Sequence, residues 1–364
     1  MRLTLFLDHD CNLRCRYCYN GSKFSSVMPL STARQAIDMM LAMNRPLQQV
    51  GFFGGEPLLH RPLIAEVISY VRGVTGGQGE KPKFVVTTNG TLLDDEMVQW
   101  LSDEGFYIGL SIDGTPEAHD AQRVCIDGSG SYAQVAAGLA RALHSGRPVR
   151  TVSVVGPDTA HLMGASFEHL LGLGVRELSF NINYEGHWDE AARGRFETGL
   201  QDLEKRYVDA YRQGKPFRFN LIDRSIVTHV KGGYESCDRC DFGCEEIAVS
   251  PAGRLYPCDR LIGEDDRDDV IIGTVETGVD ERLRDALIRS KNAVLEDCRD
   301  CAILGRCMHW CGCVNYAMTG DVGGVSGLLC WFERRLVEAA DRAGAQLFAE
   351  KNELFLRRYY RSVL

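Results

Sequence analysis

The chain has 364 residues, 45% of them hydrophobic and 25% charged, and a formal net charge of −9. These values are ordinary for a globular protein with room for one large and one small domain. The acidic balance argues against nucleic acid as a partner, because binding phosphates needs basic surface. No apolar run is long enough for a membrane span and no signal peptide is apparent, so we expect a cytoplasmic protein that does not use the membrane.

Strand-like and helix-like segments alternate through the first two-thirds of the chain. Short runs rich in Val, Ile, Leu or Phe predict buried strands at 3–7, 49–55, 83–90, 107–114, 149–156 and 175–183. Helices are expected after Ser31, a suitable N-cap, and near 61–73, 95–104, 132–145 and 159–172. Repeated strand–helix units of this kind predict an α/β fold, either a doubly wound sheet or a partial, open barrel.

Polar and glycine-rich segments follow the first four of these strands. They are the loop CNLRC at 11–15 with its extension to Cys18, GGEP at 54–57, TNG at 88–90 and SIDG at 111–114. Ligands of parallel α/β folds gather at the carboxyl ends of the strands. We therefore expect these four segments to line one site.

The character of the sequence changes near residue 230. A helix-like stretch at about 187–214 closes the alternating region, and beyond it Cys, Gly and Asp dominate with little periodicity. That texture is typical of a small domain held together by metal. We predict a first domain at 1–229, a second at 230–335 and a C-terminal helix at 336–364.

Fourteen cysteines are distributed unevenly. Three lie at 11–18, Cys125 stands alone, and ten lie between Cys237 and Cys330. Disulfides are rare in the reducing cytosol, so clustered cysteines there are better explained as metal ligands. Two metal regions are expected, and Cys125 is expected to be a buried thiol rather than a catalyst.

The first region supplies only three thiols, Cys11, Cys15 and Cys18, in a C-x3-C-x2-C pattern. A [4Fe–4S] cluster needs one ligand per iron, so three cysteines leave one iron open to a substrate or cofactor. The alternatives are a zinc site completed by a distant residue such as His9, or three unrelated cysteines.

This pattern, with aromatic Tyr17 before the last cysteine, resembles the signature of radical S-adenosylmethionine (SAM) enzymes. GGEP at 54–57 is similar to the family's motif for the amino group of SAM. SIDG at 111–114 followed by HDAQR at 119–123 resembles the corresponding segment of members that modify peptides and proteins. The resemblance implies a partial (β/α)6 TIM-like barrel. It also implies reductive cleavage of SAM to methionine and a 5′-deoxyadenosyl radical, which removes a hydrogen atom from the substrate.

The resemblance also implies which residues bind SAM. They are Tyr17 at the adenine, Gly54, Gly55 and Glu56 at the methionine amino group, and Asn89, Ser111 and Asp113 at the ribose or carboxylate. By residue type alone, all of these positions after Tyr17 also fit ordinary strand-end turns. His119, Asp120 and Arg123 are expected to support the site structurally rather than to react.

The C-terminal cysteines resemble the SPASM domain, an iron–sulfur extension of radical SAM enzymes that usually carries two auxiliary [4Fe–4S] clusters. The resemblance assigns Cys298, Cys301, Cys307 and Cys330 to one cluster, and Cys244, Cys258, Cys311 and an upstream cysteine, preferably Cys240 but alternatively Cys237, to the other. Cys313 would be spare. The rival interpretation is a pair of structural zinc sites, since CxxC pairs are shared by both.

Asp259 directly follows Cys258, at the position of the catalytic base in anaerobic sulfatase maturases. A carboxylate there can take the proton that must leave the substrate during oxidation, although a turn-capping or salt-bridged role also fits. We expect an oxidoreductase that crosslinks side chains of a ribosomally made peptide, through a carbon–carbon (cyclophane) or thioether bond, with a flavodoxin or ferredoxin as reductant. The alternatives are a sulfatase maturase that makes formylglycine from Cys or Ser, and a non-catalytic zinc-binding adaptor.

Overall fold

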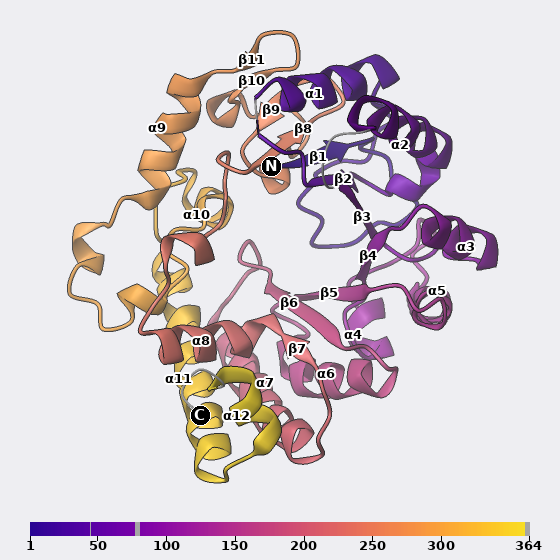
Figure 1. Cartoon of the computed structure of the whole chain (residues 1–364). Helices are drawn as coiled ribbons and strands as arrows, with labels where there is room; N and C mark the ends of the chain where they lie inside the picture. The colour runs from indigo at the N-terminus through magenta and orange to yellow at the C-terminus, as the bar shows by residue number, and fades with distance from the viewer. Residues whose placement is uncertain (44, 77–80, 361–364) are drawn as a thin grey trace. The chain divides into compact units, whose positions relative to one another are not determined.

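The computed structural model describes residues 1–43, 45–76 and 81–360 (Figure 1). These residues form two compact units, each assembled from three separate segments. The first unit comprises Met1–Ser111, Arg123–Val149 and Asp241–Ser290. The second comprises Ile112–Gln122, Arg150–Cys240 and Lys291–Leu364, described to residue 360. The predicted domain bounds at 229/230 and 335/336 stay predictions.

The sheet of the first unit is almost entirely parallel. Its strands are β1 (Arg2–Phe6), β2 (Gln49–Phe53), β3 (Lys83–Thr88), β4 (Tyr107–Ser111), β8 (Glu246–Val249) and β9 (Leu255–Tyr256). Neighbours run β4-β3-β2-β1-β8-β9, and only the β8–β9 pair is antiparallel. In the centre, Leu3 of β1 lies opposite Val50 on one side and Ile247 on the other, and all three side chains are fully buried. This unit also holds a small hairpin of β10 (Gly273–Thr274) and β11 (Gly278–Val279).

The helices of the first unit are α1 (Leu30–Ala42), α2 (Arg61–Thr75), α3 (Asp95–Asp103), α5 (Tyr132–His144) and α9 (Glu281–Asn292), the last extending two residues past the unit. On α1 the buried side chains Ala33, Ile37 and Met40 recur every three or four residues, which gives the helix one apolar face. The prediction that Ser31 is the N-cap is wrong. Pro29 has extended backbone angles and precedes the first helical residue, so Ser31 lies within the first turn.

The second unit contains three parallel strands, β5 (Val149–Val155), β6 (Glu177–Ile182) and β7 (Arg218–Phe219). Its helices are α4 (Pro116–Asp120), α6 (Met163–Gly172), α7 (Glu190–Arg212), α8 (Asn220–Lys231), α10 (Gly312–Thr319), α11 (Gly327–Ala349) and α12 (Glu353–Tyr359). The long helices α7 and α11 pack against each other, and α8 packs on α11 (Figure 1). Short 3-10 turns lie at 57–60, 160–162, 236–238, 259–261, 268–270, 296–298 and 304–306 of the chain.

The C-terminal helix differs from the predicted span of 336–364. Helix α11 begins at Gly327 because the Ser326 hydroxyl accepts a hydrogen bond from the Leu329 amide at 3.1 Å and caps the first turn. It ends at Ala349, shortly before Lys351 adopts a positive φ of 52°, and α12 follows. Residues 361–364 of the predicted helix lie outside the described residues.

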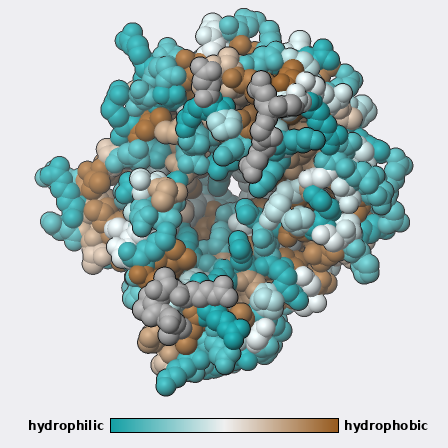
Figure 2. All heavy atoms as spheres, in the orientation of Figure 1, coloured by the Kyte–Doolittle hydropathy of each residue, from teal (hydrophilic) through white to brown (hydrophobic). Residues whose placement is uncertain are grey.

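Within the described ranges, no helix is both long and apolar enough to cross a membrane. The face drawn in Figure 2 is largely hydrophilic, with apolar side chains scattered between polar ones.

Candidate functional site

The Gly54–Gly55–Glu56 turn after β2 is bonded directly to the backbone of the three-cysteine loop. The Gly55 amide donates to the Asp8 carbonyl at 2.8 Å, and the Glu56 amide donates to the Asp10 carbonyl at 3.1 Å. A Cβ on Gly55 would lie 1.8 Å from the Asp10 carbonyl oxygen, and Gly54 has a φ of +135°. Only glycine fits this approach. The two glycines therefore fix the cysteine loop against the end of β2.

Glu56 is a buried carboxylate, 1% exposed, that ties this turn to the end of β3. One oxygen accepts hydrogen bonds from the Thr88 hydroxyl at 2.8 Å and the Leu58 amide at 3.1 Å, and the other accepts from the Asn89 amide at 2.7 Å. Burial raises the pKa of Glu56 to about 7, although these three donors favour the ionised form.

Asn89 contacts the first thiol of the loop. Its side-chain amide donates to the Asn12 side-chain oxygen at 2.7 Å and reaches the Cys11 Sγ at 3.7 Å, while its oxygen accepts from the Thr91 amide at 3.0 Å. Cys11 also accepts from the Leu13 amide at 3.4 Å. Asn89 thus positions Cys11 in this structure.

The three thiols of the loop differ in their surroundings. Burial raises the pKa of Cys11 to about 11, and the charge of Cys15 adds to this shift. Cys18 instead accepts a hydrogen bond from the Lys23 ammonium at 3.0 Å. Lys23 was not predicted as a site residue, and no local pattern singles it out because its contact depends on how the loop folds back.

Two tyrosines flank Cys18. The Tyr17 ring lies under the Arg123 guanidinium at 5.2 Å, so Arg123 supports the residue predicted at the adenine. The Tyr19 ring stacks near Phe53 and carries the Arg260 guanidinium at 4.9 Å. Burial raises the pKa of Tyr19 well above its usual range.

Asp259 lies close to the three-cysteine loop within the first unit. Its charge raises the pKa of Tyr19 further, and the charge of Cys18 acts in the same direction. The Asp259 carboxylate accepts from the Arg260 amide at 2.9 Å and from the Cys258 thiol at 3.5 Å. Burial raises the pKa of Asp259, against the lowering effect of these two partners. Tyr19 and Arg260 were not predicted as site residues; their adjacency to Cys18 and Asp259 was the available signal.

The other residues predicted to bind SAM are divided between the two units. Ser111 is the last residue of β4 in the first unit, whereas Asp113 belongs to the second. The buried Asp113 carboxylate accepts from the Val154 amide at 2.8 Å, and its own amide donates to the His119 Nδ1 at 3.3 Å. Asp113 therefore joins the chain after β4 to the end of β5 through Val154 and to α4 through His119.

The four thiols Cys298, Cys301, Cys307 and Cys330 gather within the second unit. Burial raises the pKa of Cys330, and the charges of Cys298 and Cys301 raise it further; the charge of Cys330 in turn raises the pKa of Cys307. Burial is the largest cause for Cys307, whose pKa rises to about 12.

Charged side chains surround this four-cysteine set. The Arg334 guanidinium donates to the Cys301 Sγ at 3.4 Å. Glu333, 1% exposed, pairs with Arg224 at 2.6 Å and accepts from the Met308 amide at 2.9 Å, next to Cys307. The helix α11 thus carries both a thiol, Cys330, and two charged residues one turn away.

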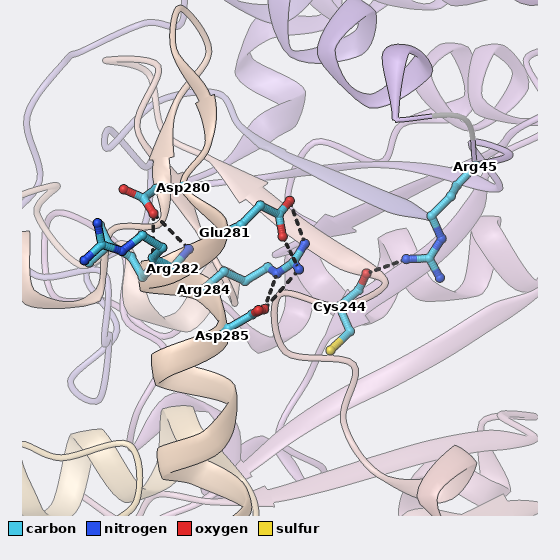
Figure 3. Close-up of polar contacts among 8 residues, drawn as sticks. Arg45, Cys244, Asp280, Glu281, Arg282, Arg284 and Asp285 are labelled. Atoms are coloured by element: carbon cyan, nitrogen blue, oxygen red, sulfur yellow. Dashed lines mark hydrogen bonds and ion pairs between the residues drawn. The ribbon is translucent and has the colours of Figure 1, made fainter.

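The other predicted auxiliary ligands are divided between the units. Cys244 and Cys258 belong to the first, and Cys240 and Cys311 to the second. Figure 3 shows the Cys244 carbonyl accepting from Arg45, at 3.1 Å, with the sulfur pointing the other way. The neighbouring start of α9 is held by Arg284, which pairs with Glu281 and Asp285 (Figure 3). Thus this second ligand set stays a prediction.

The remaining cysteines also have defined surroundings. The Cys311 and Cys313 sulfurs lie 3.6 Å apart. The exposed Cys237 lies 3.6 Å from a Glu235 carboxylate oxygen. The isolated Cys125 is half-buried and pairs with Leu13 of the cysteine loop across a β-bridge.

One group of three side chains has its ligand atoms within reach of a single metal ion. Among the described residues, only Glu235, Cys237 and Asp238 bring three ligand atoms within 4.8 Å of one another. Sulfurs around one zinc lie about 3.8 Å apart, because Zn–S bonds are about 2.3 Å. Neither the loop thiols nor the four-cysteine set brings three sulfurs within 4.8 Å of one another in the described part of the chain.

Comparisons with known proteins are consistent with this geometry. Residues 8–164 match the model of the Radical SAM superfamily. The serine-type anaerobic sulfatase-maturating enzyme of Klebsiella aerogenes is 25% identical over 320 residues, which cover 83% of this chain and 76% of that protein. The antilisterial bacteriocin subtilosin biosynthesis protein AlbA of Bacillus subtilis is 25% identical over 266 residues, covering 71% and 54%.

Solved structures show the same fold. The structure of anSMEcpe with bound AdoMet and Cp18Cys peptide superposes with a TM-score of 0.78 and 20% identity, over 94% of this chain and 98% of that one. SuiB of Streptococcus suis bound to precursor peptide SuiA gives 0.63 and 16%, over 90% and 75%. The predicted α/β fold of a partial barrel with a cysteine-rich C-terminal region is confirmed.

Proposed function

Since residues 8–164 form a radical SAM domain, we propose that this protein is a peptide-modifying radical SAM oxidoreductase. It oxidises a side chain of a ribosomally made peptide by two electrons and joins it to a second side chain through a carbon–carbon or thioether bond. The substrate loses two hydrogens in that reaction.

One observation carries this proposal. The first compact unit contains the three thiols, the Gly–Gly–Glu turn bonded to their loop, and Asp259, with Tyr19 interacting with both Cys18 and Asp259. A source of radicals and a proton acceptor in one unit suit a reaction that removes a hydrogen atom and then a proton.

The residues present fit an iron–sulfur cluster with bound SAM. Cys11, Cys15 and Cys18 would hold the cluster, which supplies the electron that splits SAM. The Gly54–Glu56 turn and Asn89 would orient the cofactor and exclude water. Asp259 would accept the substrate proton, and its raised pKa strengthens that role because a more basic carboxylate holds the proton better.

We further propose two auxiliary clusters on the SPASM-like cysteines, which would accept the second electron. Cys298, Cys301, Cys307 and Cys330 are the better supported set, because all four lie in one unit and interact electrostatically. Three cubanes in all predict about twelve irons and twelve sulfides per chain. A zinc-binding adaptor would contain zinc and no sulfide.

The partners follow from the same proposal. The substrate is a peptide or protein, and the reductant is a small electron carrier such as a flavodoxin or ferredoxin. The number of free thiols suits the reducing cytosol.

Formylglycine formation is the second candidate, and a specific observation favours it. Several curated relatives, including those of Klebsiella aerogenes and Clostridium novyi, are named anaerobic sulfatase-maturating enzymes. Asp259 would serve as the base in that reaction too.

The experiment compares Asp259→Asn with Asp266→Asn, an exposed neighbour, after anaerobic co-expression with short peptides encoded beside the gene. We expect Asp259→Asn to retain 5′-deoxyadenosine formation while peptide product falls about 10²–10⁴-fold. Mass spectrometry distinguishes the candidates: loss of two hydrogens with retention of sulfur indicates a crosslink, and an aldehyde indicates formylglycine. Full product formation by Asp259→Asn would remove the proposed base.

A further inference from the structure

The segment 309–315, in the cysteine-rich part of the second unit, contains several buried polar atoms without partners. Four of the ten such side-chain atoms among the described residues lie here: both ring nitrogens of His309, the Trp310 indole nitrogen and the Asn315 side-chain oxygen. Buried polar groups are nearly always hydrogen-bonded, because an unpaired one loses its bonds to water and gains none in return. This concentration indicates that a bound group supplies the partners.

His309 is 4% exposed, and the chain around it fixes where it lies. Its backbone hydrogen-bonds to the Cys307 thiol, which opposes the rise in the Cys307 pKa that burial causes. The Asn315 side-chain amide donates to the His309 carbonyl at 2.8 Å and to the Val322 carbonyl at 3.0 Å. His309 is therefore held beside a thiol of the four-cysteine set, and its imidazole takes no part in the bonds that hold it.

The surroundings of the imidazole are positively charged. Burial lowers the pKa of His309, and the charges of Arg239 and Lys291 lower it further. The Cys307 backbone and the Glu333 charge act in the opposite direction, but Glu333 is already bound in an ion pair at 2.6 Å. Lys291 is 3% exposed, so water screens its charge little. The imidazole is neutral with one N–H to donate, and it lies where positive charge favours an anionic acceptor.

The sulfurs of an iron–sulfur cluster match this demand. Thiolates and sulfides carry negative charge and accept hydrogen bonds from N–H groups, which help to set the potential of the cluster. The Trp310 indole nitrogen is a second buried donor, on a side chain that is 6% exposed and packs edge-to-face on Tyr234 at 5.2 Å. A third is the Arg239 Nε, which is also buried without a partner among the described residues. The available donors thus outnumber the one unpartnered acceptor, the Asn315 oxygen.

We propose that the His309 imidazole donates its N–H to a sulfur of the auxiliary cluster on the four-cysteine set. This inference rests on the proposed function, which assigns a cluster to those cysteines. A hydrogen bond to a cluster sulfur stabilises the more negative, reduced state and so raises the reduction potential. The substrate loses one hydrogen atom, one proton and one electron, and His309 makes this set of cysteines the favoured acceptor of that electron. His309 is a positioning residue for electron transfer and does not touch the substrate.

The test is a redox titration followed by electron paramagnetic resonance. It uses the full chain with Cys11, Cys15 and Cys18 changed to alanine, so that the loop gives no cluster signal. The signal that disappears on adding Cys330→Ala identifies the four-cysteine set. His309→Phe keeps a ring and removes the donor. We expect it to retain iron and sulfide and to lower the ratio of reduced to oxidised cluster about tenfold at a fixed potential, which is about 59 mV for one electron.

Further variants separate the hydrogen bond from packing. His309→Asn and His309→Gln place an amide N–H near the positions of Nδ1 and Nε2, and one of the two should recover most of the potential. The matched control is His229→Phe, because His229 lies on α8 in the same unit and its side chain is 59% exposed. That control should leave the potential unchanged.

An unchanged potential in His309→Phe would overturn the proposal, as would a shift confined to the other auxiliary cluster or a failure of both amide variants to recover it. Loss of iron equal to that of Cys330→Ala would make His309 a ligand instead. Zinc without sulfide at this set would overturn the cluster and the role of His309 together. The measurement uses neither SAM nor peptide. If the potential shifts but co-expressed peptides are never modified, the proposed function fails while the role of His309 stands.

Discussion

The two cysteine sites that the structure describes within single units are built by different means. In the three-cysteine loop, the Gly–Gly–Glu turn bonds to the loop backbone, Asn89 reaches Cys11, and one charged side chain, Lys23, donates to Cys18. In the four-cysteine set, the helix α11 supplies a fourth thiol together with charged side chains. The proposed open site is thus held mainly by backbone bonds from the ends of the strands, whereas the proposed closed site takes a thiol and two charged side chains from one helix.

Replacing Cys11, Cys15 and Cys18 together with alanine is the strongest test of this contrast. We expect 5′-deoxyadenosine formation to fall by far more than the 10–100-fold typical of residues that only support metal ligands. Anaerobic incubation with SAM and dithionite measures it. Cys330→Ala should instead retain 5′-deoxyadenosine and lose about a third of the iron. If both variants behave alike, the two sites do not differ in role.

Gly55→Ala tests whether the backbone fixes the open site. A Cβ there would meet the Asp10 carbonyl at 1.8 Å, so the loop must move. We expect about a 100-fold loss of 5′-deoxyadenosine formation with the iron of the four-cysteine set retained. Gly194→Ala, on α7 with open space around it, is the control and should be neutral or slightly stabilising. Unchanged turnover in Gly55→Ala would contradict the close packing.

Glu56 makes the folding stability of the protein depend on pH. Its pKa rises from 4.5 to about 7 on folding, so folding disfavours the ionised form. The stability it contributes is present below pH 4.5 and is lost as the pH rises through about 7, by about 3 kcal/mol. Urea denaturation of the metal-free protein across pH 4.5–8 should show this loss. Glu56→Gln should reduce it and the exposed Glu276→Gln should not; identical profiles would show that Glu56 ionises freely.

Arg334→Gln tests the role of charge at the closed site and has the smallest expected effect. Loss of the hydrogen bond to Cys301 should lower the reduction potential of the bound cluster by about 20–40 mV, the one-electron equivalent of about 0.5–1 kcal/mol. Arg335→Gln is the matched control, because Arg335 pairs with Glu197 instead, at 3.0 Å. A redox titration followed by electron paramagnetic resonance measures both. Equal shifts would assign the effect to general surface charge.

Much of the fold was predictable because its strands are short apolar runs separated by clear helical periodicity. All six predicted strand–helix alternations have counterparts in the structure. The strand β8 was missed, since the four residues Glu246–Val249 lie in a segment dominated by cysteine and glycine. Its place beside β1 depends on a contact across more than 240 residues of chain, which no local pattern reports.

The site was predictable to the level of motifs. Gly55, Glu56 and Asn89 were predicted as contacts of a cofactor, which stays a prediction; the structure shows that they bond the cysteine loop to β2 and β3. Lys23 and Arg334 were missed, because hydrogen bonds from long, flexible side chains to a sulfur follow from tertiary packing. A sequence motif can therefore predict the type of site, whereas the side chains that hydrogen-bond to its sulfurs are found only from the folded structure.

The pairing of β8 with β1 has a consequence for synthesis on the ribosome. Until residue 249 has left the exit tunnel, the first strand of the emerging chain has one bare hydrogen-bonding edge. A nascent chain with that edge exposed is prone to mispairing with its neighbours on the same messenger. Chaperone demand should therefore peak late in translation, and a fragment cut at residue 229 should aggregate rather than fold alone.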